Sequence, residues 1–143
     1  LARILGIERP KVAILSAVET ISVKIASTTE AASLCKMADR GQIVGGLLDG
    51  PLAMDNAISK VAAEIKGIKS EVAGDADILL VPDLEAGNIL AKQLTFMAQA
   101  DAAGIVLGAR APIILTSRAD NVRTRMASCA VAVLIAHTRR GSR

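Results

Sequence analysis

The chain has 143 residues, of which 52% are apolar and 22% are charged, a composition typical of a globular protein with one sizeable core. Its net charge is +3, with arginines gathered near the end of the chain, but one Phe and no Trp or Tyr leave almost no surface for stacking bases, so we do not expect nucleic-acid binding. No apolar run approaches the roughly 20 residues of a membrane span, so we do not expect a membrane partner.

Two cysteines and one histidine give little material for metal or triad chemistry. Cys35 and Cys129 each fall within a helical pattern, and two cysteines do not make a disulfide framework. We expect both to be buried thiols of a reducing cytoplasm. His137 stands near the end of the last predicted helix.

The first part of the chain alternates between short apolar runs and helical patterns. Residues 12–15 and 43–48 predict strands. A capping box at residues 27–30 predicts a helix that runs to about Arg40. Asp49-Gly50-Pro51 predicts a turn, with Pro51 opening a single helix that runs to about Lys66.

The second part repeats this alternation. Residues 78–82 are unbroken in apolar character, which is typical of a parallel strand covered on both faces. A polar corner at 83–88 leads into a helix predicted over 87–100. Strands are then predicted at 104–108 and from Pro112 to about Ser117.

A last helix is predicted over residues 121–137, and its pattern predicts which side chains face inward. The expected buried residues are Val122, Met126, Cys129, Ala130, Val133 and Leu134. The alternation as a whole predicts an α/β fold, a largely parallel sheet with flanking helices in three α/β/α layers.

Polar residues follow four of the predicted strands, at Ser16, Asp49, Asp83-Leu84-Glu85 and Ser117-Arg118. Ligands of open parallel sheets bind beyond the carboxyl ends of the strands, so these corners predict one lined edge. Ser and Asp are also common helix caps, and that reading stays open for Ser16 and Asp49. Beside Asp83, Gly87 and Asn88 allow a close approach of the backbone to a ligand.

The corner at Ser117-Arg118-Ala119-Asp120 is the strongest of the four. A guanidinium at a helix start opposes the helix dipole unless an anion is present, and it offers phosphate two parallel hydrogen bonds. The alternative is an ion pair between Arg118 and Asp120 or another carboxylate.

Three stretches, residues 48–57, 77–88 and 111–120, make the chain similar to the C-terminal half of the phosphate acetyltransferase and phosphate butyryltransferase family. The resemblance implies two α/β domains of the isocitrate-dehydrogenase-like type with the active site in the cleft. It places most of the second domain at residues 1–103, the return to the first domain at 104–143, and the N-terminal half outside this chain. It also implies a cytoplasmic homodimer, with a hydratase-like domain fused upstream in some members.

The resemblance implies the reaction acyl-CoA + phosphate ⇌ acyl phosphate + CoA, by direct attack of the CoA thiolate. CoA is then a substrate, and no cofactor is bound permanently. In this family Ser117 would donate to the oxyanion and Arg118 would hold phosphate. Acetyl-type members carry an aspartate base where this chain has Thr124, which leaves Asp120 either as the base or as a helix cap.

The remaining polar corner residues are expected to bind substrate. They are Asp49, Asp83, Glu85, Gly87 and Asn88. Two alternatives stay open. One is a metal-dependent, decarboxylating dehydrogenase-like enzyme that uses Asp49, Asp83 and Glu85 as ligands; the other is a CoA- or phosphate-binding module without a base.

Overall fold

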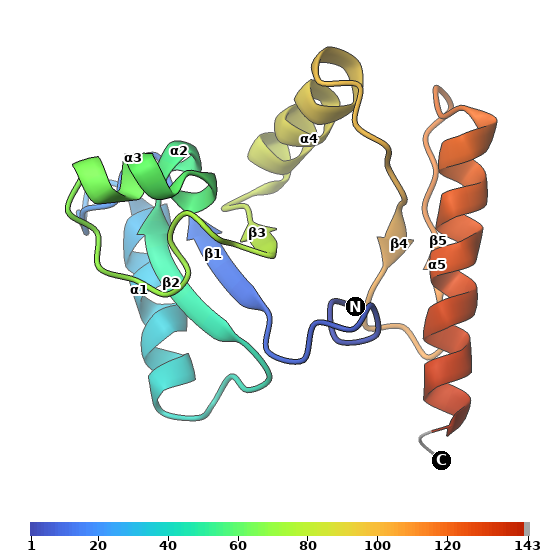
Figure 1. The fold of residues 1–143 in the computed structure, drawn as a ribbon, viewed down its shortest axis with the longest axis horizontal. Coiled ribbons are helices and arrows are strands. Elements are labelled where there is room, and N and C mark those ends of the chain that lie inside the picture. Colours follow the sequence, from blue (N-terminus) through green and yellow to red (C-terminus); the bar gives the residue numbers. More distant parts are fainter. Residues whose placement is uncertain (142–143) are drawn as a thin grey trace. The chain divides into compact units, whose positions relative to one another are not determined.

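A computed structural model describes residues 1–141. They fall into two compact units, one formed by Ala2–Gly87 and one by Leu1 together with the residues from Asn88 onward. Figure 1 labels the helices and strands of both units. The predicted division after residue 103 stays a prediction.

A parallel three-stranded sheet forms the centre of the first unit. Its strands are β1 (Lys11–Leu15), β2 (Leu47–Leu52) and β3 (Ile78–Leu80), in the order β2-β1-β3. Helix α1 (Ala26–Asp39) lies along β2 and also touches β1 (Figure 1). The predicted α/β class with a parallel sheet flanked by helices is therefore confirmed.

Strand β2 begins later than predicted, and the predicted turn at Asp49-Gly50-Pro51 is wrong. These residues lie inside β2, with Asp49 opposite Ala13 of β1 and a cis peptide bond between Gly50 and Pro51. A side chain on Gly50 would come within 2.8 Å of Ile14. Glycine thus allows β2 to pass close to β1, and long-range pairing overrides the local turn signal.

The single helix predicted up to Lys66 is broken in two. Helix α2 (Met54–Ile58) ends where Ser59 adopts an extended conformation, and the Ser59 hydroxyl caps α3 (Lys60–Ile65) by accepting from the Ala62 N–H at 3.3 Å. The break rotates the inward face. Of the apolar residues on these two helices, Ala57 is buried but Ile58, Val61 and Ile65 are exposed.

Helix α1 begins earlier than the predicted capping box allows, because Ile25 stands at its N-cap position. The buried Thr28 hydroxyl instead accepts from the Ser22 N–H at 2.9 Å and lies 2.7 Å from the Ile25 carbonyl. Thr28 therefore joins the loop after β1 to the first turn of α1.

Small side chains dominate the core of the first unit. Its buried apolar residues are Ala13, Ile14, Leu15, Ala31, Leu52, Ala57, Ala63, Val72 and Ala73. Alanine side chains let neighbouring helices and strands pack closely in this core.

Strand β3 pairs only with β1, and its apolar side chains Ile78 and Leu80 are partly exposed. The predicted cover on both faces is therefore wrong within this unit. Helix α4 (Leu84–Lys92) follows and continues as one turn of π-helix, η1 (Gln93–Met97). It begins before the predicted start at Gly87, because Asp83 caps it.

In the second unit a short antiparallel pair lies against a long helix. The strands are β4 (Ile105–Val106) and β5 (Ile113–Ile114), and the helix is α5 (Val122–Gly141). Gly104 ties them together: its oxygen accepts from Leu115 N–H at 3.0 Å, and its N–H donates to the buried Ser128 hydroxyl at 3.0 Å. A side chain on Gly104 would clash with the Leu115 carbonyl.

The inward face of α5 differs from the predicted one. Ser128, Ala132 and Ile135 are buried, whereas the predicted inward residues remain partly or largely exposed. The exposed ones include Val122 at 77%, Met126 at 65% and Val133 at 67%. The hydrogen bond from Gly104 to Ser128 turns this face of α5 inward. The apolar pattern of the sequence could not indicate this face, because Ser128 is polar. No helix within residues 1–141 has the length and apolar character needed to cross a membrane.

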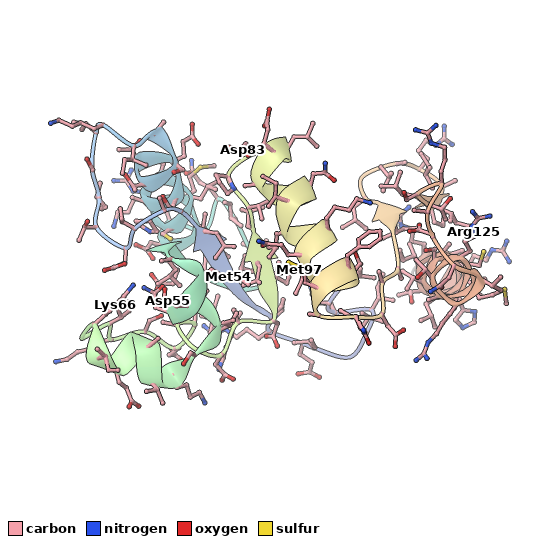
Figure 2. All side chains as sticks on the ribbon, turned by 90° about the horizontal axis from the view of Figure 1, so that it is seen from above. Met54, Asp55, Lys66, Asp83, Met97 and Arg125 are labelled. Carbon is pink, nitrogen blue, oxygen red and sulfur yellow. The ribbon has the colours of Figure 1, made fainter. Side chains whose placement is uncertain are left out.

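A charged cluster joins the loop after β1 to α2 and α3 of the first unit. The Lys66 ammonium lies 3.2 Å from carboxylate oxygens of both Glu19 and Asp55, and Figure 2 labels Lys66 beside Asp55. The pKa of Glu19 is lowered, first by a hydrogen bond from its own backbone and then by Lys66. The pKa of Asp55 is lowered mainly by Lys66, and that of Lys66 is raised mainly by Asp55.

Lys66→Met should flatten the acid dependence of stability. A carboxylate whose pKa is lowered in the folded state stabilises the fold at pH values above its unfolded-state pKa of about 4. This stabilisation is lost as the pH falls through the pKa of the folded state. The stability difference between wild type and Lys66→Met should therefore be largest near neutral pH and shrink from about pH 5 to about pH 3. Urea unfolding across that range measures it, with Lys69→Met as the control for removing an exposed lysine. Equal acid dependence in all three proteins would contradict the assignment.

Candidate functional site

The polar corner after β5 is a tight turn closed at both ends. The Ser117 N–H donates to Oδ2 of Asp120 at 2.6 Å, and the Asp120 N–H donates to the Ser117 carbonyl at 3.1 Å. Asn121 caps α5 by accepting from the Thr124 N–H at 2.9 Å. The alternative that Asp120 caps the helix is therefore wrong: its carboxylate holds the turn that carries Ser117.

Arg118 projects from the same turn without a protein partner. Its side chain is exposed, and it has no hydrogen bond or ion pair to any residue between 1 and 141. The alternative of an ion pair with Asp120 is wrong, because the Asp120 carboxylate binds the Ser117 backbone instead. An exposed guanidinium on a fixed turn can bind an anion without first breaking an internal contact.

The corner forms one wall of a groove of about 540 Å³ within the second unit. Ser117 and Asp120 line this wall, and Thr124 lies next to them on α5. The opposite wall is a face of α4 and η1 that includes Asn88. The structure thus joins three of the predicted site residues, Asn88, Ser117 and Asp120, in one groove, while Arg118 is not among the lining residues.

Several groove residues were missed from the sequence. Lys92 and Phe96 line the wall opposite Ser117, and the Lys92 Nζ lies 5.5 Å from the centre of the Phe96 ring. Asn121 lines the groove beside Asp120. The i, i+4 spacing of Asn88, Lys92 and Phe96 places them on one helical face, and that spacing was the available signal.

The other residues of the predicted 83–88 corner belong to the start of α4. The Asp83 carboxylate accepts from the Ala86 N–H at 2.7 Å and so serves as the helix cap; Figure 2 labels Asp83 at this end of α4. Glu85 is exposed in the first helical turn. Gly87 lies in the helix, where a side chain would come within 3.0 Å of Val81.

Asp49 and Ser16 also form hydrogen bonds with residues of the first unit. Asp49 Oδ1 accepts from the Gly50 N–H at 2.8 Å within β2. The Ser16 hydroxyl lies 2.8 Å from that of Ser27, and the Ser16 N–H donates to Leu52. Ser16 therefore joins the end of β1 to α1 and β2, which agrees with a structural role.

Cys35 packs beside Asp49 and is partly buried, whereas Cys129 is exposed, so the prediction that both thiols are buried is wrong for Cys129. The Cys35 thiol lies 3.6 Å from the Gly50 carbonyl as a weak donor. Burial raises the pKa of Cys35 to about 11, and the charges of Asp49 and Asp39 add to this effect.

No group of three His, Cys, Asp or Glu side chains within the described part of the chain is arranged to hold a metal ion. Asp49, Asp83 and Glu85, the ligands suggested for a dehydrogenase-like enzyme, are each placed separately: on β2, at the α4 cap and on the first turn of α4.

Comparison with known sequences gives a consistent result over nearly the whole chain. Residues 1–133 match the family described as phosphate acetyl/butaryl transferase. A phosphate acetyltransferase of Rhizobium meliloti is 70% identical over 138 residues, which cover 96% of this chain and 44% of that protein. A phosphate butyryltransferase of Clostridium acetobutylicum is 53% identical over 135 residues, which cover 94% of this chain and 45% of that protein.

Solved structures agree with this result. A branched-chain phosphotransacylase from Enterococcus faecalis superposes with a TM-score of 0.84 at 35% identity, over 95% of this chain and 49% of that one. A phosphotransacetylase from Staphylococcus aureus gives a TM-score of 0.77 at 28% identity, over 94% of this chain and 42% of that one. The chain thus spans less than half the length of these relatives.

Cys35 should be alkylated much more slowly than Cys129 near pH 8, because the thiolate is the nucleophile and Cys35 has a pKa raised to about 11. Asp49→Asn removes one of the charges that raise this pKa and should speed the reaction of Cys35. Mass spectrometry of iodoacetamide-treated protein over time measures both rates. Equal rates at the two cysteines would contradict the burial of Cys35.

Asp120→Ala should loosen the Ser117 turn, whereas Asp120→Asn keeps a side-chain oxygen that can accept from the Ser117 N–H. Loss of a hydrogen bond worth about 1 kcal/mol should raise hydrogen exchange at the Ser117 amide roughly fivefold. Exchange measured by NMR tests this, with Asp101→Ala as a control that removes an exposed carboxylate paired with Arg123. Unchanged exchange in Asp120→Ala would show that the turn does not depend on Asp120.

Proposed function

Because the chain belongs to the phosphate acetyltransferase and phosphate butyryltransferase family, we propose that the full-length protein transfers an acyl group between CoA and inorganic phosphate. In the direction of acyl-CoA synthesis, the CoA thiolate attacks the carbonyl carbon of an acyl phosphate. A carbon–sulfur bond forms, the carbon–oxygen bond to phosphate breaks, and phosphate leaves. CoA is a substrate in this reaction, and no permanently bound cofactor takes part.

The observation that carries the proposal is the placing of a hydroxyl and an unpaired guanidinium on one fixed turn. The Ser117 oxygen accepts weakly from the Ala119 N–H at 3.4 Å, which leaves its O–H proton available. This proton can be donated to the carbonyl oxygen as negative charge develops there. Arg118, with no internal partner in the described chain, can hold the phosphate that leaves.

The same turn supplies a proton acceptor. Asp120 is the only carboxylate among the described residues that line the groove. One of its oxygens is engaged by the Ser117 N–H, and the other has no partner within residues 1–141. We propose that this second oxygen accepts the proton of the CoA thiol, because the thiolate is the nucleophile. Thr124, at the position of the acetyl-type aspartate, lines the groove but cannot take this role.

Asn88 lies in the groove with Ser117 and is a direct candidate for contact with substrate. Substrate contacts by Asp49, Asp83, Glu85 and Gly87, which lie in the first unit, stay predictions. The homodimer, the cytoplasmic location and an upstream hydratase-like domain also stay predictions. Family membership argues against the dehydrogenase-like alternative.

Arg118→Ala in the full-length protein should raise the KM for phosphate by about tenfold or more and lower turnover, because a charge-assisted hydrogen bond is lost. Arg118→Lys should restore only part of the activity, since lysine lacks the two-pronged guanidinium. Thiol release from acetyl-CoA and butyryl-CoA in phosphate buffer measures these effects and sets the acyl preference. Arg40→Ala is the matched control, an exposed arginine at the far end of α1.

The possible results distinguish the role of Arg118 in phosphate binding from the acyl transfer activity of the protein. Wild-type kinetics in Arg118→Ala would remove the phosphate-binding role from Arg118. No thiol release from either substrate by the wild-type protein would reject acyl transfer and leave a CoA- or phosphate-binding module.

A further inference from the structure

The groove wall opposite Ser117 carries a lysine that has no role in the acyl transfer proposed for Ser117, Arg118 and Asp120. Lys92 stands in the last turn of α4 and is the only basic side chain among the described residues lining the groove. Within residues 1–141 its one side-chain interaction is with the Phe96 ring, 5.5 Å from Nζ to the ring centre. No carboxylate within residues 1–141 lies within ion-pair distance of it.

The single carboxylate of the groove does not neutralise Lys92. Asp120 directs one oxygen to the backbone of its own turn, 2.6 Å from the Ser117 nitrogen. Phe96 is one turn after Lys92 and is 66% exposed. A lysine over an aromatic face keeps its charge and all three of its hydrogen-bond donors, and the contact limits where its head group can lie.

Neutral donors surround the same space. The Ser117 hydroxyl proton is available, and the Asn121 side chain uses its oxygen to cap α5, which leaves its NH₂ group free to donate. Thr124 adds a hydroxyl on the same wall. An unpaired cation beside several available hydrogen-bond donors suits the binding of an anion rich in oxygen atoms.

We infer that Lys92 is a phosphate-binding residue of this groove, acting from α4 opposite the Ser117 turn. This inference rests on the proposed acyl transfer, because the phosphate belongs to one of its substrates. The group bound is either the phosphate that is transferred or a phosphate of CoA; both present the same oxygens. Arg118 is not among the lining residues, so Lys92 supplies the groove with a charge that Arg118 does not.

The test compares Lys92→Gln, Lys92→Arg and the wild type in the full-length protein. Lys36→Gln is the matched control, an exposed lysine that pairs with Asp39 on α1. Lys92→Gln should raise one KM by about 10- to 100-fold, the size expected for a lost charged hydrogen bond, with a much smaller change in kcat. Lys92→Arg should restore most of the loss, and Lys36→Gln should leave both constants unchanged.

The substrate whose KM rises shows which phosphate group Lys92 binds. A rise confined to the KM of inorganic phosphate and acetyl phosphate assigns Lys92 to the transferred group. A rise confined to the KM of CoA assigns it to CoA, and repeating the measurement with 3′-dephospho-CoA separates the 3′-phosphate from the diphosphate. A structural role would not produce this selectivity or be rescued by arginine.

Calorimetric titration with CoA and with inorganic phosphate keeps the inference testable apart from catalysis. If the wild type binds either ligand without turning it over, the proposed acyl transfer fails, while weaker binding by Lys92→Gln still supports the role of Lys92. If the wild type is active and Lys92→Gln keeps every KM and dissociation constant within about twofold, a difference below 0.5 kcal/mol, the inference on Lys92 is overturned.

Discussion

The second unit depends on one close approach of main chain to main chain, at Gly104. Its oxygen accepts from Leu115 N–H and its N–H donates to Ser128, so one residue joins two strands to α5. A side chain at this position would occupy the place of the Leu115 carbonyl. Because Leu115 precedes Ser117 by two residues, the same contact fixes where the Ser117 turn lies against the helix.

This placement explains why neighbouring residues have different surroundings. Ser117 lines the groove and has its amide held by Asp120, whereas Arg118 follows directly and lies outside the lining. In the proposed reaction the Ser117 hydroxyl and the Arg118 guanidinium act on two parts of one substrate. An acyl phosphate has two such parts, a carbonyl that changes geometry and a phosphate that leaves.

The local signals of the sequence were sufficient for the class of fold and for placing the polar Ser117 corner between a strand and a helix. Alternating apolar runs and helical patterns predict β1, α1 and the parallel sheet, and the Ser117 corner lies where a strand hands over to a helix. Long-range contacts account for the failures. Asp49 is drawn into β2 by pairing with β1, and the buried face of α5 is set by the polar Ser128. Lys92 was missed because its importance depends on what lies across the groove.

The alanine core of the first unit has a consequence for how this chain can change. At Ala13 and Ala57, whose side chains are wholly enclosed, every replacement except glycine adds volume. A larger buried side chain such as Leu52 can be shortened while its surroundings partly collapse, but at these two alanines any added atom must displace closely packed neighbours. Substitution at Ala13 and Ala57 is therefore more restricted than substitution at the surface of this unit.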